Sequence, residues 1–152
     1  MIFTTKAEYG VRLLIQLGLQ GGDAPVSLKA VAEAENLPLA YLERIAALLK
    51  KHELIRATRG AHGGYLLARP ATEITMDAVV LALEGAIAPM DCFFDDRDNR
   101  VSCSHHTDGE HCATKLLWTR VQMGVINSLQ RTTLAELVQF ATPNEPHLEI
   151  HG

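Results

Sequence analysis

Apolar residues recur at helical spacing along the first third of the chain. A first helix is expected to begin at Thr4 or Thr5, with Ser27 capping a second, short helix. A third helix is predicted from about Leu39 to Lys51, after a turn at 36–38. The expected buried faces are Ala7, Val11, Leu14, Ile15 and Gly18 in the first helix, and Leu42, Ile45, Ala46 and Leu49 in the third.

Alternation replaces helical spacing after residue 53. The stretches "LIRAT" (54–58) and "GYLLAR" (64–69) alternate, with Gly60 and Gly63 between them and Gly64 at the start of the second. This pattern predicts a two-stranded hairpin with a basic tip. A fourth helix is expected between Thr75 as its cap and Gly85 as its stop.

A long helix is predicted from about Ala113 to Gln130, and a short one follows a cap at Thr132 or Thr133. The long helix carries Leu117, Val121, Val125 and Leu129 on one side, and Leu116 and Met123 on the opposite side. A helix with apolar groups on both sides is usually buried on both sides. We therefore expect a second subunit to cover one of them.

Together these elements predict a mainly α fold with a small β-hairpin wing. Residues 1–84 form a winged helix-turn-helix domain, 85–112 a cysteine-rich loop, 113–140 a dimerisation helix with a short terminal helix, and 141–152 a flexible tail. No run approaches the ~18 to 20 apolar residues of a membrane helix, and the N-terminus does not resemble a secretory signal. A cytoplasmic protein with no membrane partner is expected.

The charge distribution changes the picture that the overall net charge of −4 gives. Residues 1–70 carry nine Lys/Arg and six Asp/Glu, whereas residues 71–152 carry five and twelve. Within 38–69 the count is six to two, a net of +4. Because salt screens charges beyond ~10 Å, this local excess governs contact with phosphate.

Helix, turn, helix and glycine-tipped hairpin, in this order, are typical of proteins that read DNA. The second helix of such a pair enters the major groove, and the wing approaches phosphates or the minor groove. An enzyme is not expected, because the chain shows neither a phosphate-cradling glycine loop after a strand nor a convincing Ser/His/Asp spacing. The candidate DNA-binding residues are Ser27, Ala40, Tyr41, Glu43, Arg44, Lys50, Lys51, Arg59, His62, Gly63, Gly64 and Tyr65, with Arg56 as a further phosphate contact.

All three cysteines, Cys92, Cys103 and Cys112, lie within one loop that also holds six acids and three histidines. An odd number of clustered thiols in a reducing compartment favours metal or redox chemistry over disulfides. Three thiolates can hold an iron–sulfur cluster, [2Fe-2S] or [4Fe-4S], but a fourth ligand is then missing. His105, His106, His111 and the loop carboxylates are candidates; zinc, a thiol switch and plain buried cysteines remain alternatives.

The motifs "TTKAEYGVRLL" (4–14), "AYLERI" (40–45) and "RGAHGGYLLAR" (59–69), with the three-cysteine loop before a long helix, resemble the Rrf2 family of bacterial winged-helix regulators. Its iron–sulfur sensors are of the IscR and NsrR kinds. The resemblance covers about residues 1–140. It implies a homodimer crossed through the long helix, which binds palindromic double-stranded operator DNA, usually as a repressor.

The resemblance also implies that Cys92, Cys103 and Cys112 bind an iron–sulfur cluster, although their spacing is wider than is usual in the family. IscR-like members use a histidine three residues after the last cysteine, where this chain has Lys115. NsrR-like members use an acid from the partner's N-terminal region, and Glu8 matches that position. Operator affinity would then respond to nitric oxide, redox state or iron supply. An iron–sulfur assembly or electron-transfer protein is the other class left open.

Overall fold

The computed structural model describes residues 3–20, 24–88 and 113–143. Its elements, in chain order, are α1 (Thr5–Leu19), α2 (Leu28–Glu35), α3 (Leu39–Lys51), β1 (Ile55–Thr58), β2 (Gly64–Leu67), a 3-10 turn η1 (Ala71–Glu73), α4 (Met76–Glu84), α5 (Ala113–Arg131) and α6 (Leu134–Ala141). The predicted mainly helical chain with one hairpin is confirmed. None of the described helices is long and apolar enough to cross a membrane.

Local chemistry explains where the helices begin and end. Thr4 caps α1 by accepting from the amide of Lys6, and Ser27 caps α2 by accepting from the amide of Ala30. Asn36 ends α2 in the left-handed region (φ 52°), which asparagine tolerates better than most residues. Thr133 and Glu136 form a reciprocal capping box at the start of α6.

The core is aliphatic and lies where α1, α3 and α4 meet. Leu42, Ile45, Ala46 and Leu49 form the buried stripe of α3, as predicted. Of the predicted α1 stripe, Ala7 and Leu14 are buried and Val11, Ile15 and Gly18 are half-buried. Gly10, Leu13 and Leu17, which were not predicted, are buried as well. The reason is that α1 is packed by α3, α4 and α6, so its buried face is wider than one stripe.

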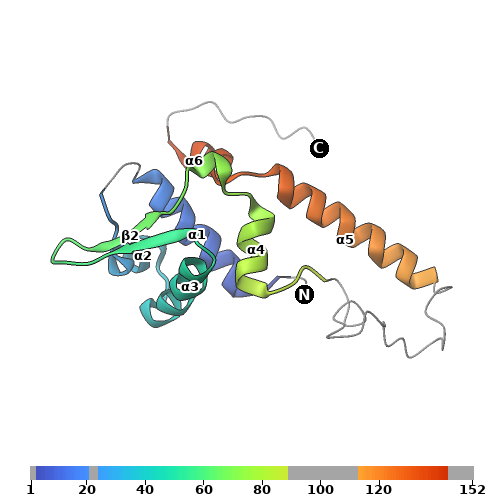
Figure 1. Cartoon of the computed structure of the whole chain (residues 1–152), viewed down its shortest axis with the longest axis horizontal. Helices are drawn as coiled ribbons and strands as arrows, with labels where there is room; N and C mark the ends of the chain where they lie inside the picture. Colours follow the sequence, from blue (N-terminus) through green and yellow to red (C-terminus); the bar gives the residue numbers. More distant parts are fainter. Residues whose placement is uncertain (1–2, 21–23, 89–112, 144–152) are drawn as a thin grey trace.

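The two C-terminal helices differ in how they meet this core. Chain reversal after α5 brings α6 back onto α1, where Leu134 is completely buried. In contrast, α5 extends away from the rest of the chain and packs mainly on α4 (Figure 1), and none of its residues is buried. Val121, Val125 and Leu129 are half-buried, but Leu117, predicted on the same side, is exposed because it lies near the end of α5 that extends beyond the core.

The antiparallel hairpin projects from the opposite end of the molecule (Figure 1). Its register pairs Ile55 with Leu67 and Thr58 with Gly64. Buried Ile55 and Leu66 anchor its base to the core, while residues 59–62 at its tip are exposed. The hairpin is therefore fixed at one end and free at the other, as a wing requires.

Candidate nucleic-acid interface

The exposed side of α3 presents small and charged side chains to solvent. Ala40, Glu43, Arg44 and Ala47 are exposed, opposite the buried stripe. Lys50 and Lys51 extend the same helix with two further exposed cations at its last turn. Small side chains let a helix approach base edges, and arginine can bind guanine through two hydrogen bonds.

Tyr41 differs from the other candidates on α3, because it is half-buried. Its ring packs edge-on against the ring of Tyr9, with centroids 5.6 Å apart and an interplanar angle of 86°. The two hydroxyl oxygens of Tyr41 and Thr5 lie 3.4 Å apart. Tyr41 therefore connects the first turn of α3 to the first two turns of α1.

The tip of the wing offers one arginine and one histidine, Arg59 and His62, both exposed. The glycines behind them are explained by the chain's own backbone. A Cβ at Gly64 would overlap the carbonyl oxygen of Val26, and one at Gly63 would overlap that of Thr58. From the sequence, these glycines were predicted to let DNA come close to the backbone of the wing. In the structure, it is the chain's own backbone that lies close to them.

Two backbone hydrogen bonds bring the segment before α2 close to the hairpin. The amide of Val26 donates to the carbonyl of Tyr65 at 3.0 Å, and the amide of Tyr65 donates to the carbonyl of Val26 at 2.8 Å. Val26 directly precedes Ser27, whose hydroxyl is engaged with the Ala30 amide at 3.1 Å. The wing and the start of α2 are thus held as one unit.

A basic hollow of about 680 Å³ lies between the end of α3 and the base of the wing. Lys50, Arg56 and Arg69 line it, with Glu53 as the acid. Arg69 donates from Nε to the carbonyl of Glu53 at 3.4 Å and from a terminal nitrogen to that of His52 at 3.5 Å. These contacts hold the turn after α3, where Glu53 adopts a left-handed conformation (φ 56°).

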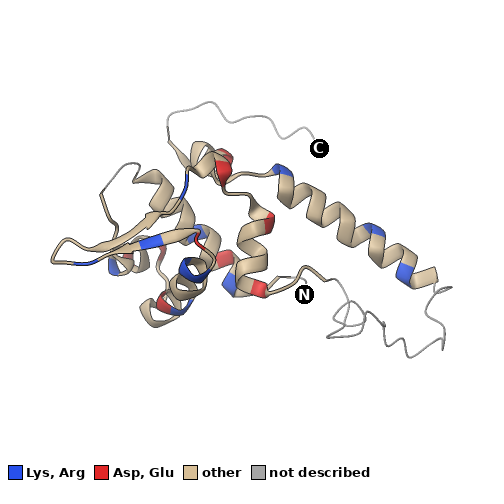
Figure 2. Cartoon of the chain, in the orientation of Figure 1, with Lys and Arg blue, Asp and Glu red and all other residues tan. Residues whose placement is uncertain are grey.

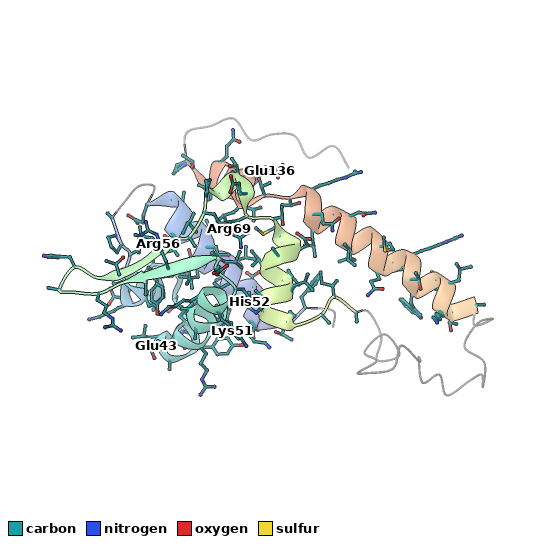
Figure 3. All side chains as sticks on the ribbon, in the orientation of Figure 1. Glu43, Lys51, His52, Arg56, Arg69 and Glu136 are labelled. Carbon is teal, nitrogen blue, oxygen red and sulfur yellow. The ribbon has the colours of Figure 1, made fainter. Side chains whose placement is uncertain are left out.

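Sequence reasoning named Lys50 and Arg56 but not Arg69. The count of basic residues over 38–69 includes Arg69, yet only the fold brings it beside Arg56 (Figure 3). Lys51 lies on α3 near the same region, and Glu43 lies toward the other end of the helix. Figure 2 shows Lys and Arg residues on α3 and the hairpin, although α3 also carries the acid Glu43, whereas α4 and α6 carry acids and no Lys or Arg.

Glu8 lies in the first turn of α1, with its side chain 59% exposed. Its carboxylate oxygen Oε1 accepts from Arg12 Nε at 2.9 Å. It also lies at an apolar hollow of about 380 Å³ lined by Phe3, Ala7, Val11, Val80 and Leu129, among others. An exposed pair of this kind is worth only ~0.3–0.5 kcal/mol, so Glu8 can exchange Arg12 for another partner at little cost.

The predicted cysteine ligands Cys92, Cys103 and Cys112 lie outside the described residues, as do His105, His106 and His111. Glu8 is the single member of the predicted ligand set within them. In the described ranges no three His, Cys, Asp or Glu side chains gather closely enough to hold a metal ion. Among its described neighbours Glu8 therefore has no co-ligands, and the proposed set needs sulfurs from elsewhere.

Comparison with known proteins agrees with this fold. Residues 3–139 match the model of the Rrf2 family, described as an iron-dependent transcriptional regulator. The protein rrf2 of Nitratidesulfovibrio vulgaris is 35% identical over 93% of this chain and 90% of its own. The transcriptional regulator IscR of Sodalis glossinidius is 33% identical over 99% of this chain and 84% of its own.

Among solved structures, CymR of Bacillus subtilis, described as its global cysteine regulator, superposes with a TM-score of 0.74 and 31% identity. The superposition covers 92% of this chain and 98% of CymR. The relatives are transcriptional regulators, and the similarity extends over the wing, the helix-turn-helix and the C-terminal helices alike. The chain belongs to the Rrf2 family of winged-helix transcriptional regulators.

Proposed function

We propose that this chain is a homodimeric repressor whose affinity for a palindromic operator is controlled by an iron–sulfur cluster. The observation that carries the DNA-binding part is the arrangement of α3, the basic hollow and the wing. Arg44 and Glu43 would contact base edges, Arg59 and His62 would follow the adjacent groove, and Lys50, Lys51 and Arg56 would bind phosphates. These roles suit the exposure of each side chain.

The proposed dimer interface is the outer face of α5. Leu116 and Met123 are 58% and 50% exposed and lie one above the other on this face, two helical turns apart. A helix of 19 residues with no buried residue gains little from its own chain. Pairing α5 with a second copy would bury these side chains and set the distance between the two α3 helices near one DNA turn, ~34 Å.

The proposed cluster ligands are Cys92, Cys103 and Cys112 with Glu8 of the partner subunit. An iron–sulfur cluster can respond to oxidants, to nitric oxide and to iron supply. The same thiolate and carboxylate side chains without a cluster would not respond to all three. Support comes from the iron-dependent description of the family, the likeness to IscR, and the weakly held, exposed carboxylate of Glu8. Release of Arg12 would free Glu8 for this role.

A second candidate is a clusterless regulator in which oxidation of the cysteines alone changes DNA affinity. The likeness to CymR favours it, because an oxidized form of the Staphylococcus aureus CymR has been crystallised. Iron and acid-labile sulfide in the purified protein separate the two candidates. The cluster-bound regulator contains both, and the clusterless one contains neither.

The phosphate contacts give a direct test of the DNA-binding surface. The probe is the duplex that the wild-type chain enriches from a randomised pool. Replacing both Lys50 and Arg56 with glutamine is expected to reduce the slope of log K against log[salt] by ~2, since each phosphate contact contributes ~0.9. Arg131→Gln, which removes an exposed cation from the last turn of α5, is the control and should leave the slope unchanged. An unchanged slope in the double variant contradicts the proposed surface.

A further inference from the structure

Glu84, the last residue of α4, reaches across to the start of α1. Its Oε1 accepts from the amide of Thr4 at 2.9 Å and from the Thr4 hydroxyl at 2.6 Å. The same hydroxyl oxygen accepts from the amide of Lys6 at 3.2 Å. A hydrogen-bonded chain thus runs from the end of one helix into the first turn of another.

The electrostatic setting favours this contact. A carboxylate at the C-terminal end of its own helix is unfavourable, whereas one beside the N-terminal end of another helix is stabilising. Glu84 lies at the C-terminal end of α4 and also beside the N-terminal end of α1. Its contact with α1 is the favourable one of these two interactions. Glu84 therefore acts as a second cap of α1, supplied by α4.

The start of α1 in turn holds the start of α3. Thr5 and Tyr9, in the first two turns of α1, are the residues that contact Tyr41. Packing along α1 is equally tight, because a Cβ at Gly10 would overlap Leu83 Cδ1 of α4 and lie 3.5 Å from Ile45 Cγ2 of α3. A shift of the α1 N-terminus relative to α4 must consequently move Tyr41 or break its contacts.

We propose that Glu84 is a positioning residue for α3, acting through Thr4, Thr5 and Tyr9 on Tyr41. This inference rests on the proposed role of α3 in reading DNA. Glu84 itself lies away from the basic hollow and directly precedes Gly85. Two residues beyond Gly85, the carbonyl of Ile87 accepts from Gln122 of α5 at 2.7 Å. The end of α4 is thereby linked both to α5 and to the DNA-reading helix.

Two variants of Glu84 separate positioning from charge. Glu84→Ala removes the acceptor, while Glu84→Gln keeps an oxygen that can accept from Thr4. Glu73→Ala, which removes an exposed carboxylate from η1, is the matched charge control. All are made in the full chain, and equilibrium unfolding verifies that each variant folds.

The first readout is amide hydrogen exchange in the free protein, which needs no DNA. The hydrogen-bonded amides of Ala7 and Glu8 report on α1, and those of Tyr41 and Leu42 report on α3. Glu84→Ala is expected to accelerate exchange at both pairs by ~5-fold, the range set by loss of a cap. Glu84→Gln and Glu73→Ala should stay within twofold of the wild type. Acceleration at Ala7 and Glu8 alone, with Tyr41 and Leu42 unaffected, overturns the proposal.

The second readout is affinity for the duplex enriched by the wild-type chain. Glu84→Ala is expected to weaken binding ~10-fold, and combining it with Tyr41→Ala should cost less than the product of the two single effects. Independent, multiplicative losses count against the link. If the wild-type chain enriches no duplex, the proposed function fails, and the exchange experiment still decides whether Glu84 positions α3.

Discussion

Replacing Cys92, Cys103 and Cys112 together with serine is expected to remove all bound iron and sulfide and to abolish the response of operator affinity to nitric oxide. Serine keeps the size of each side chain but lacks the soft, readily ionised sulfur that iron–sulfur clusters require. The buried core of the described residues is built mainly by α1–α4 and α6, so the winged domain should still fold. Absorption spectra, metal analysis and binding to the enriched duplex check the three parts of this expectation.

Glu8→Ala is expected to have a smaller effect on the cluster than the triple variant. It should leave the cysteines to hold a weakened cluster that loses iron faster under air, without changing the thermal unfolding temperature by more than about 2 °C. Glu33→Ala, which removes an exposed carboxylate from α2, is the matched carboxylate control. If the triple variant still binds iron and responds to nitric oxide as the wild type does, the cysteines are not the sensor.

Met123→Lys is expected to convert the dimer into monomers and to weaken operator binding at least ~100-fold. The substitution would place an unpaired charge in the middle of the proposed interface, which costs several kcal/mol, and each ~1.4 kcal/mol is a factor of ten. Lysine is chosen because α5 contains Lys115, Arg120 and Arg131 but no acid, so a glutamate could pair with a partner's arginine.

Ser128→Lys serves as the control for Met123→Lys, because Ser128 is also exposed but lies on a different side of α5. It should remain dimeric. Sedimentation velocity gives the oligomeric state and circular dichroism the helix content. A dimeric Met123→Lys protein would mean that the outer face of α5 is not the interface.

The sequence was sufficient for the local structure. The start of α3 and its buried stripe follow from the proline-led turn and the spacing of Leu42, Ile45 and Leu49, and the structure confirms both. Capping chemistry located Ser27 and Gly85 correctly. These predictions succeed because each depends on residues close together along the chain.

Contacts between residues far apart along the chain could not be predicted from the sequence. Nothing in the spacing indicates that Glu84 would cap a helix eighty residues earlier, or that Arg69 would share a hollow with Lys50. Gly64 was recognised as special, but its reason is the backbone of Val26, which only the fold brings close. The roles assigned to the cysteines stay predictions from residue type and family resemblance.

The most direct test of the central claim is the iron and acid-labile sulfide content of anaerobically purified protein, followed by operator affinity before and after nitric oxide. A regulator controlled by a cluster is expected to be coloured, to contain iron and sulfide in similar amounts, and to lose affinity once nitric oxide bleaches the colour. Colourless protein with stoichiometric zinc, or an affinity that does not change as the colour bleaches, would contradict it.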